Sequence, residues 1–255
     1  MLIVVGITAF LTAALTLFSG FGLGSLLLPA FAVFFPLPVA VAATAVVHLL
    51  NNLFKAAMLG RHAQWRVVLA FGIPGAVAAF FGAWALRGLT GHAPLATWQL
   101  FERECAVTPD GLAIGGLILA FALFELHPTA RKVGFAPRWL PLGGVLSGFL
   151  GGLSGHQGAL RSAFLLRLSL PKEAYIGTGV MCAVIIDLVR LTEYARGGLA
   201  PLTDAWDAVA VGTASAFVGS YLGRKLLRKV TMRAIHLLVG WLLVALGASI
   251  AAGLV

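Results

Sequence analysis

A glycine-rich motif that occurs twice inside long apolar segments constrains this chain more than any other feature. Residues 19–29 read SGFGLGSLLLP, and residues 147–163 read SGFLGGLSGHQGALRSA. Each motif interrupts an apolar segment, and each is followed by a Leu-Pro step into another apolar segment. Glycine-broken membrane segments at corresponding places in two halves of a chain are typical of transporters, whose binding sites lie at the breaks. The duplication therefore predicts a protein that carries a substrate across a membrane.

The composition is that of a membrane protein. Hydrophobic residues make up 60% of the chain and charged residues 11%, and the mean hydropathy is +0.98. A soluble domain could not keep this much apolar surface from water. The net charge of +9 would suit a nucleic-acid-binding protein, but the Lys and Arg residues cluster between apolar runs, as they do in membrane proteins. We therefore predict contact with membrane lipid and no nucleic-acid partner.

Motifs of enzymes and cofactor sites are missing from the sequence. Cys105 and Cys182 lack the CxxC spacing of a metal or redox site, and there is no P-loop, HExxH or Ser-His-Asp pattern. We predict no metal, no cofactor and no enzymatic activity. The apolar stretch 1–18 has no leading positive residue and no clear cleavage site, so we expect it to be retained rather than removed as a signal peptide.

Two of the eight apolar segments have an unusual length. Six segments could each cross a hydrocarbon core roughly 30 Å thick, which needs about 20 helical residues. The first and fifth segments are too long for one crossing and too short for two, and glycine breaks both in the middle. A re-entrant helical hairpin, which enters the membrane and returns to the same side, fits that length. The segments are 1–35, 39–59, 67–86, 112–126, 139–168, 174–194, 208–222 and 235–255.

The distribution of basic residues favours this hairpin topology. If both hairpins return to the side they entered, one face holds thirteen of the 18 basic residues, whereas single crossings would divide them about evenly. Cytoplasmic loops carry the excess of Lys and Arg, so we predict that both termini lie outside the cytoplasm. The thirteen are Lys55, Arg61, Arg66, Arg131, Lys132, Arg138, Arg167, Lys172, Arg224, Lys225, Arg228, Lys229 and Arg233.

The same topology predicts an all-α integral membrane protein built as an inverted repeat. Each half contains one hairpin and three crossing helices, an odd number of crossings, so the second half enters the membrane upside down. We expect the first repeat at 1–126, a basic linker at 127–138 and the second repeat at 139–255. Corresponding residues are Gly22 and Gly155, Pro38 and Pro171, Thr44 and Thr178, and the pair Gly75 and Gly82 with Gly212 and Gly219.

The order of these motifs resembles the TauE/SafE family, also called the sulfite exporter family. The resemblance rests on the glycine-rich first segment, on Pro38 and Thr44 opening the next helix, and on the repetition of both after a basic linker. It implies a multi-pass permease of the bacterial inner membrane for sulfite, organosulfonates or related small anions. The chain departs from many relatives at Gly22-Leu23-Gly24-Ser25 and at His156, Gln157 and Arg161, where further glycines are common.

The candidate site can also be argued from charge. Arg161 lies six residues after Gly155 in an otherwise apolar segment, and a buried guanidinium costs several kcal/mol unless it is paired. Its partner could be an anionic substrate, for which its planar donors and the backbone N–H groups of a broken helix are suited, or Asp187 in a structural salt bridge. Glycine lets the backbone approach a ligand closely. The glycines concerned are Gly20, Gly22, Gly24, Gly152, Gly155 and Gly158.

Polar residues with helical spacing extend this site. Thr44, His48 and Asn51 or Asn52 fall on one helix face, where they could bind the anion or join helices to one another. His156 and Gln157 lie at the predicted tip of the second hairpin. Asp187 is our candidate for proton coupling. The residues predicted to bind the anion are Arg161, His156, Gln157, Gly22, Gly24, Ser25, His48, Asn51, Asn52, Thr44, Gly155 and Thr178.

Two further expectations concern the outer surface. Arg190, Glu193 and Arg196 follow Asp187 toward the end of its helix, where long charged side chains usually reach to the membrane interface. The segment 88–110 is expected to form a short surface helix.

The sequence as a whole predicts a secondary transporter that moves a small anion by alternating access between two hairpin tips. An anion channel with the same site, and a membrane component of a complex that processes a sulfur or lipid metabolite, remain open alternatives. So does the association of two copies as a homodimer.

Overall fold

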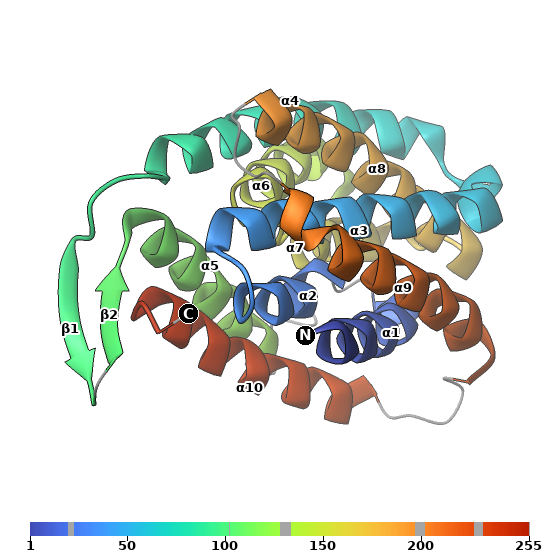
Figure 1. Ribbon diagram of the computed structural model, residues 1–255. Helices are drawn as coiled ribbons and strands as arrows, with labels where there is room; N and C mark the ends of the chain where they lie inside the picture. Colours follow the sequence, from blue (N-terminus) through green and yellow to red (C-terminus); the bar gives the residue numbers. More distant parts are fainter. Residues whose placement is uncertain (20–22, 102, 128–133, 197–201, 227–231, 255) are drawn as a thin grey trace.

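The computed structural model describes residues 1–19, 23–101, 103–127, 134–196, 202–226 and 232–254 as a bundle of helices with one β-hairpin (Figure 1). Three of the helices are long and apolar enough to cross a membrane, and several shorter ones are also apolar. The helices are α1 (Leu2–Ser19), α2 (Leu23–Ala32), α3 (Leu37–Leu59), α4 (Trp65–Leu89), α5 (Pro109–Leu126), α6 (Leu140–Ser154), α7 (Gly158–Leu165), α8 (Lys172–Arg196), α9 (Trp206–Leu226) and α10 (Met232–Ala251). The predicted all-α membrane fold is confirmed, except that the structure also contains the β-hairpin.

The second long apolar segment is broken where the glycines predict. Helix α6 ends at Ser154, and Gly155 has a φ of 81°, a left-handed conformation that glycine adopts without strain. Helix α7 then runs back along α6, because the Ser147 hydroxyl donates to the carbonyl oxygen of Gln157 at 2.9 Å and the ring of Phe164 lies against Gly143. Helices α6 and α7 therefore form the expected helical hairpin.

The first long segment is divided in the same way. Helix α1 ends at Ser19 and α2 begins at Leu23, and the break itself lies outside the described residues. The start of α1 and the end of α2 meet at one place, since Val5 and Phe31 both lie close to Gly212 of α9. Helix α2 thus folds back toward the beginning of α1.

Glycines bring the backbones of α4 and α6 into direct contact. Gly144, Gly148 and Gly152 of α6 are spaced four residues apart and face the backbone carbonyls of Phe71, Gly75 and Ala79 of α4. Rows of small residues at this spacing allow membrane helices to approach closely, where van der Waals packing replaces the hydrophobic effect. Gly152, which we expected beside the substrate, is used in this helix contact.

The helix contacts are reciprocal between the two halves of the chain. Gly82 of α4 faces the carbonyl of Phe149 in α6, and Gly219 of α9 faces the carbonyl of Phe10 in α1. In the same way, Gly75 of α4 touches Ile186 of α8, while Gly212 of α9 lies next to Val47 of α3. The fourth helix of each half therefore packs on the first and third helices of the other half.

This close contact yields a prediction for α4. A Cβ atom at Gly82 would overlap the Phe149 carbonyl, whereas one at Gly88 would meet nothing within 4 Å. We expect Gly82→Ala to lower the free energy of unfolding by about 1–3 kcal/mol, because backbone atoms cannot move aside as side chains do. Gly88→Ala, in the same helix, should be neutral or stabilising, since alanine is the better helix former. Melting curves in detergent test both variants. Equal melting temperatures for Gly82→Ala and Gly88→Ala would contradict the close contact between Gly82 and the Phe149 carbonyl.

The segment after α4 does not form the expected surface helix. Strands β1 (Ala96–Leu100) and β2 (Arg103–Val107) pair antiparallel and extend away from the bundle (Figure 1). Trp98 pairs with the buried Cys105, and its indole N–H donates to the carbonyl oxygen of Ala252 at 2.8 Å. Aromatic and β-branched residues such as Trp98 favour strands, and the pairing satisfies backbone groups that an isolated short helix would leave exposed.

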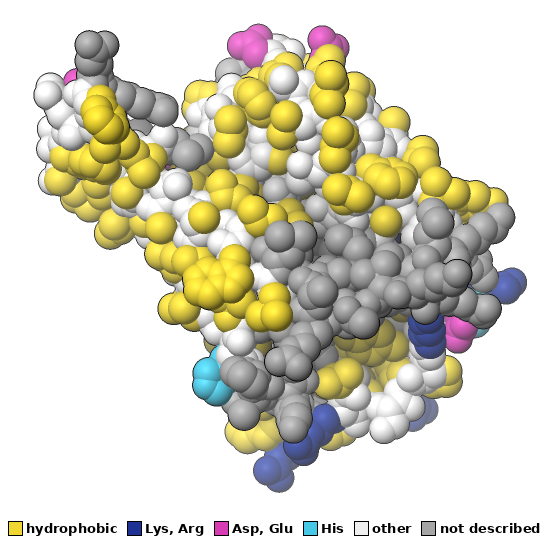
Figure 2. Space-filling model, turned by 90° about the horizontal axis from the view of Figure 1, so that it is seen from below, with side chains coloured by type: hydrophobic (Ala, Val, Ile, Leu, Met, Phe, Trp, Pro, Cys, Tyr) yellow, Lys and Arg dark blue, Asp and Glu magenta, His cyan; other side chains and the backbone are white. Residues whose placement is uncertain are grey.

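The two ends of the bundle differ in charge. One end of the bundle contains the C-terminal ends of α3 and α7 and the N-terminal ends of α4 and α6, and the residues next to these helix ends include Arg61, Arg66, Arg138 and Arg167. Figure 2 shows Lys and Arg gathered at one end of the visible face. The opposite end bears the β-hairpin. The C-terminal residues contact that hairpin through Ala252, and the start of α1 lies beside the first turns of α9 through Val5 and Gly212. Both chain ends therefore lie away from the Arg-rich end.

Candidate functional site

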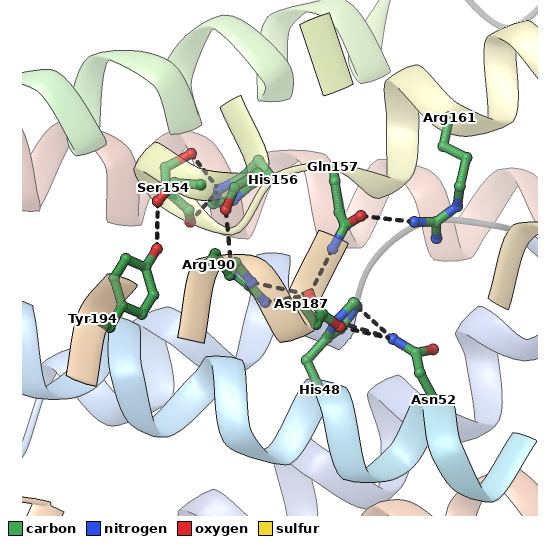
Figure 3. A network of polar contacts seen from close by, with 11 residues as sticks. His48, Asn52, Ser154, His156, Gln157, Arg161, Asp187, Arg190 and Tyr194 are labelled. Atoms are coloured by element: carbon green, nitrogen blue, oxygen red, sulfur yellow. Dashed lines mark hydrogen bonds and ion pairs between the residues drawn. The ribbon is translucent and has the colours of Figure 1, made fainter. Parts of the chain in front are cut away.

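Asp187 of α8 is the centre of a buried polar network (Figure 3). Its Oδ2 atom accepts a hydrogen bond from His48 Nδ1 at 2.6 Å and one from Asn52 Nδ2 at 3.3 Å, both on α3. Its Oδ1 atom accepts from Gln157 Nε2 at 2.8 Å and from Arg190 Nε at 2.9 Å. Four donors thus surround one carboxylate, which is how a buried negative charge becomes tolerable.

Gln157 connects this carboxylate to Arg161. Because Asp187 can only accept, the amide nitrogen of Gln157 must point toward it, and the amide oxygen is left to face Arg161. Arg161 Nη1 donates to Gln157 Oε1 at 3.1 Å. The backbone carbonyl of Gln157 is itself held by Ser147. The network therefore fixes the tip between α6 and α7 and positions the guanidinium of Arg161.

Arg161 does not form the salt bridge with Asp187 that was the structural alternative. Asp187 is paired with Arg190, whose Nη2 atom lies 2.9 Å from Oδ1, and with His48. Arg161 is only 8% exposed, and no carboxylate among the described residues lies within ion-pair distance of it. A buried guanidinium in this position retains donors for an anion.

Two predictions about the end of α8 are wrong. Arg190 and Glu193 were expected to reach the membrane interface, yet they are 1% and 3% exposed. Arg190 turns inward because Asp187 lies one helical turn away, and its Nη1 atom also donates to the carbonyl of Gly151 at 3.2 Å. Glu193 is paired with Arg87 of α4 at 2.8 Å. Hydrogen bonding inside the bundle thus outweighs the usual preference of these side chains for the interface.

Tyr194 adds a further connection between α8 and the hairpin. Its hydroxyl donates to the carbonyl oxygen of Gly152 near the end of α6. Together with the bond from Arg190 to Gly151, this contact leaves two carbonyls of the last α6 turn held by α8 (Figure 3). The Gly151 carbonyl also accepts from the backbone N–H of Gly155 at 2.9 Å, whereas the Gly152 carbonyl lies at a helix end, where carbonyls lack partners inside the helix, and is satisfied by Tyr194.

His156 lies at the hairpin tip, as predicted. Its Nδ1 atom is 3.0 Å from the carbonyl oxygen of Ser154, which can only accept, so Nδ1 carries the proton. The ring stacks on Phe121 of α5 with centroids 5.8 Å apart. Nε2 is then an acceptor, and it is buried with no hydrogen-bond partner among the described atoms. An unpaired buried nitrogen at this tip is available to a ligand that donates a hydrogen bond.

The first broken segment reaches the tip of the second. A Cβ atom at Gly24, in the first turn of α2, would lie 3.2 Å from the carbonyl oxygen of Gly155 and 3.9 Å from the methyl group of Thr44. The Thr44 hydroxyl is buried without a described partner. Ser25 is half-buried beside Gly24, and Gly22 lies outside the described residues. The structure therefore brings Gly24, Thr44 and Gly155 together.

Asn51 and Thr178 make other contacts. With its amide in the orientation that satisfies every neighbour, Asn51 donates to Ser220 Oγ of α9 at 2.8 Å and accepts from Lys55 Nζ at 3.2 Å. Thr178 accepts a hydrogen bond from the backbone N–H of Gln64 at 2.9 Å, in the connection before α4. Of the two adjacent asparagines, Asn52 belongs to the Asp187 network and Asn51 joins α3 to α9.

The arrangement offers hydrogen-bond donors and positive charge rather than ligands for a metal. No group of three or more His, Cys, Asp and Glu side chains comes together within the described ranges. The model of the sulfite exporter TauE/SafE family matches residues 5–250. The chain belongs to this family. It is thus a member of a family of membrane transporters, and the resemblance inferred from the motifs is confirmed. Searches of curated proteins and of solved structures gave no match.

Sequence reasoning about this TauE/SafE protein missed four residues of the polar interior. Arg190 and Tyr194 hold the hairpin, and Lys55 and Ser220 contact Asn51. A signal for Lys55 was present, because it continues the spacing of His48 and Asn52 by one more turn along the same helix face. The count of basic residues assigns Lys55 to the cytoplasmic face, which does not predict that its side chain turns into the bundle.

Proposed function

We propose that this TauE/SafE protein is a secondary transporter that moves sulfite, an organosulfonate or a related small sulfur-containing anion across the bacterial inner membrane. The observation that supports it best is Arg161, buried in a broken membrane helix and bonded to the neutral Gln157 instead of a carboxylate. An oxyanion of sulfur presents several acceptor oxygens on one face, which the planar donors of arginine can meet. The anion would bind between Arg161 and the tip residues 155–157.

The contacts between the two halves support an inverted repeat with alternating access. Helix α4 packs on α6 and α8, while α9 packs on α1 and α3. This exchange of partners is what a two-fold relation between the halves requires. Gly24 of the first half and Gly155 of the second also meet at the proposed site. A site at the boundary between two such units can be exposed to either side as one unit rocks against the other.

Charge supports an orientation for the transporter. The Arg-rich end of the bundle would face the cytoplasm, which leaves both termini and the β-hairpin outside. Asp187, bonded to His48 at 2.6 Å, is the carboxylate through which we propose that protons are coupled to transport. Asp187 is hydrogen-bonded to Gln157, so a change in the charge of Asp187 would act on a residue that lines the proposed anion site.

Counterflow in proteoliposomes tests this function. Vesicles that contain the purified protein and are loaded with unlabelled sulfite should take up labelled sulfite faster than the same vesicles without internal sulfite. The rate of uptake should saturate as the external sulfite concentration rises. Organosulfonates and sulfate, added outside in turn, would rank the substrates by competition. Flux that neither saturates nor responds to internal anion would identify a channel. Vesicles that move none of these anions would overturn the proposal.

A further inference from the structure

Lys55 is a second buried cation near the proposed site. It lies on α3, two turns beyond His48, and is 6% exposed. Near the end of a membrane helix, a lysine side chain usually extends to the lipid headgroups. Here the side chain is turned into the bundle, with its ammonium group 3.2 Å from the amide oxygen of Asn51.

Lys55 and Arg161 both extend from the Asp187 network, since Lys55 lies one turn beyond Asn52 on α3 and Arg161 lies one turn beyond Gln157 on α7. They belong to α3 and α7, the same elements that meet around Asp187. Arg161 is bonded to Gln157 and Lys55 to Asn51, and both of these side chains are neutral. The described hydrogen-bond partners of these two buried cations are therefore neutral amides.

The charges in this interior do not balance. Asp187 is the carboxylate of the network, and its partner is Arg190. Glu193 is paired with Arg87. The other side chains that act electrostatically on Arg161 are Cys182 and Tyr175, which carry a thiol and a phenol rather than a carboxylate. Two positive charges, on Arg161 and Lys55, are left without a carboxylate among the described residues.

We propose that Lys55 and Arg161 together form a two-cation site that selects a doubly charged anion over a singly charged one. A dianion would neutralise both buried charges, whereas a monoanion would leave one of them unpaired in a low-dielectric interior. Within the proposed function, this inference assigns a substrate class: sulfite as the dianion, sulfate, or a sulfonate that carries a carboxylate. Lys55 is then a specificity-determining residue that the transport hypothesis alone does not require.

A matched pair of ligands separates charge from size. Sulfoacetate and 2-hydroxyethanesulfonate have the same two-carbon length and the same sulfonate group, and differ in a carboxylate against a hydroxyl. Binding of each is measured by calorimetry on the purified protein, and competition with labelled sulfite is measured in vesicles. We expect the native protein to bind sulfoacetate at least tenfold more tightly, and Lys55→Met to lose that preference while its affinity for 2-hydroxyethanesulfonate stays within about twofold.

Two control variants and one measurement of stability complete the test. Lys55→Arg keeps the charge and should keep the preference. Arg66→Met removes an exposed cation from the same end of the bundle and should change neither affinity. Lys55→Met should fold well, and its melting temperature without anion should rise, because an uncompensated buried charge has been removed.

The possible results distinguish the two proposals. Equal binding of both sulfonates by the native protein, or an equal loss of both in Lys55→Met, would overturn the dianion site while transport of a small anion stands. Failure of the native protein to bind or move any anion in the panel would overturn the transport proposal and the dianion site together.

Discussion

Replacing Arg161 with methionine is expected to weaken binding of the transported anion about 30-fold or more and to remove counterflow at moderate substrate concentrations. The guanidinium is the charged group that we place in direct contact with the anion. Methionine has a similar reach and no charge, so it preserves the volume of the side chain while removing every donor.

The expected loss is large because the interaction is buried. Arg161 is 8% exposed, and its described hydrogen bond is to the amide oxygen of Gln157. Charged hydrogen bonds are stronger in such an environment than at a surface, where water competes for both partners and salt screens the charges. The same burial means that, without bound anion, Arg161→Met should be at least as stable as the native protein, since Arg161 has no carboxylate partner in the described part of the chain.

Arg167→Met is the matched control for this variant. Arg167 follows α7 in the short helix η4 (Leu166–Leu168), and its side chain is exposed. Thermal melting with a saturating anion should show a stabilisation in the native protein and in Arg167→Met that Arg161→Met lacks. A ligand at about 100 times its dissociation constant contributes roughly 2.7 kcal/mol, which is readily seen as a shift in melting temperature. If Arg161→Met is stabilised as strongly as the native protein, the guanidinium is structural and the site lies elsewhere.

Replacing Asp187 with asparagine is expected to lower the free energy of unfolding by about 3–5 kcal/mol and to abolish transport. Asparagine has the shape of aspartate without its charge. Arg190, which is 1% exposed, would then be left as an unpaired buried cation in an interior that also holds Arg161 and Lys55. The hydrogen bond to Gln157 would also lose its charged acceptor, and with it the constraint that orients the tip toward Arg161.

A double variant separates the structural role of Asp187 from its role in transport. Exchange of a buried ion pair for apolar residues of similar size is often neutral or stabilising, so Asp187→Leu with Arg190→Met should recover much of the stability that Asp187→Asn loses. Transport should not recover, because Gln157 has lost its partner. Recovery of both would show that Asp187 serves the fold alone.

Glu193→Gln provides the comparison for the size of the effect. Glu193 is buried, but its partner Arg87 is 38% exposed and can turn to solvent when the carboxylate is removed. We expect a loss of about 1 kcal/mol or less for this variant. A loss in Glu193→Gln as large as that in Asp187→Asn would contradict the view that burial of the remaining cation determines the penalty.

The positions of the helix breaks follow from sequence because they depend on local chemistry. Glycine at 155 takes the left-handed conformation that ends α6, and the length of each apolar segment limits how it can cross a membrane. The duplication of the motif and the order of the prolines sufficed to indicate the family. The outer β-hairpin was not foreseen, since its stability depends on pairing between 96–100 and 103–107 and on contact with Ala252, far along the chain.

Spacing along a helix determines which side chains share a face, but it does not determine what that face meets. His48 and Asn52 could be grouped from sequence, and so could Asp187 and Arg190. That the first pair meets the second, that Gln157 and not Asp187 contacts Arg161, and that Lys55 turns inward depend on how α3, α7 and α8 are rotated about their axes. That rotation depends on contacts between helices distant in sequence, such as Gly177 of α8 against the Leu59 carbonyl of α3 and Phe164 of α7 against Gly143 of α6. Only the tertiary structure therefore decides which buried charges are paired and which remain for a ligand.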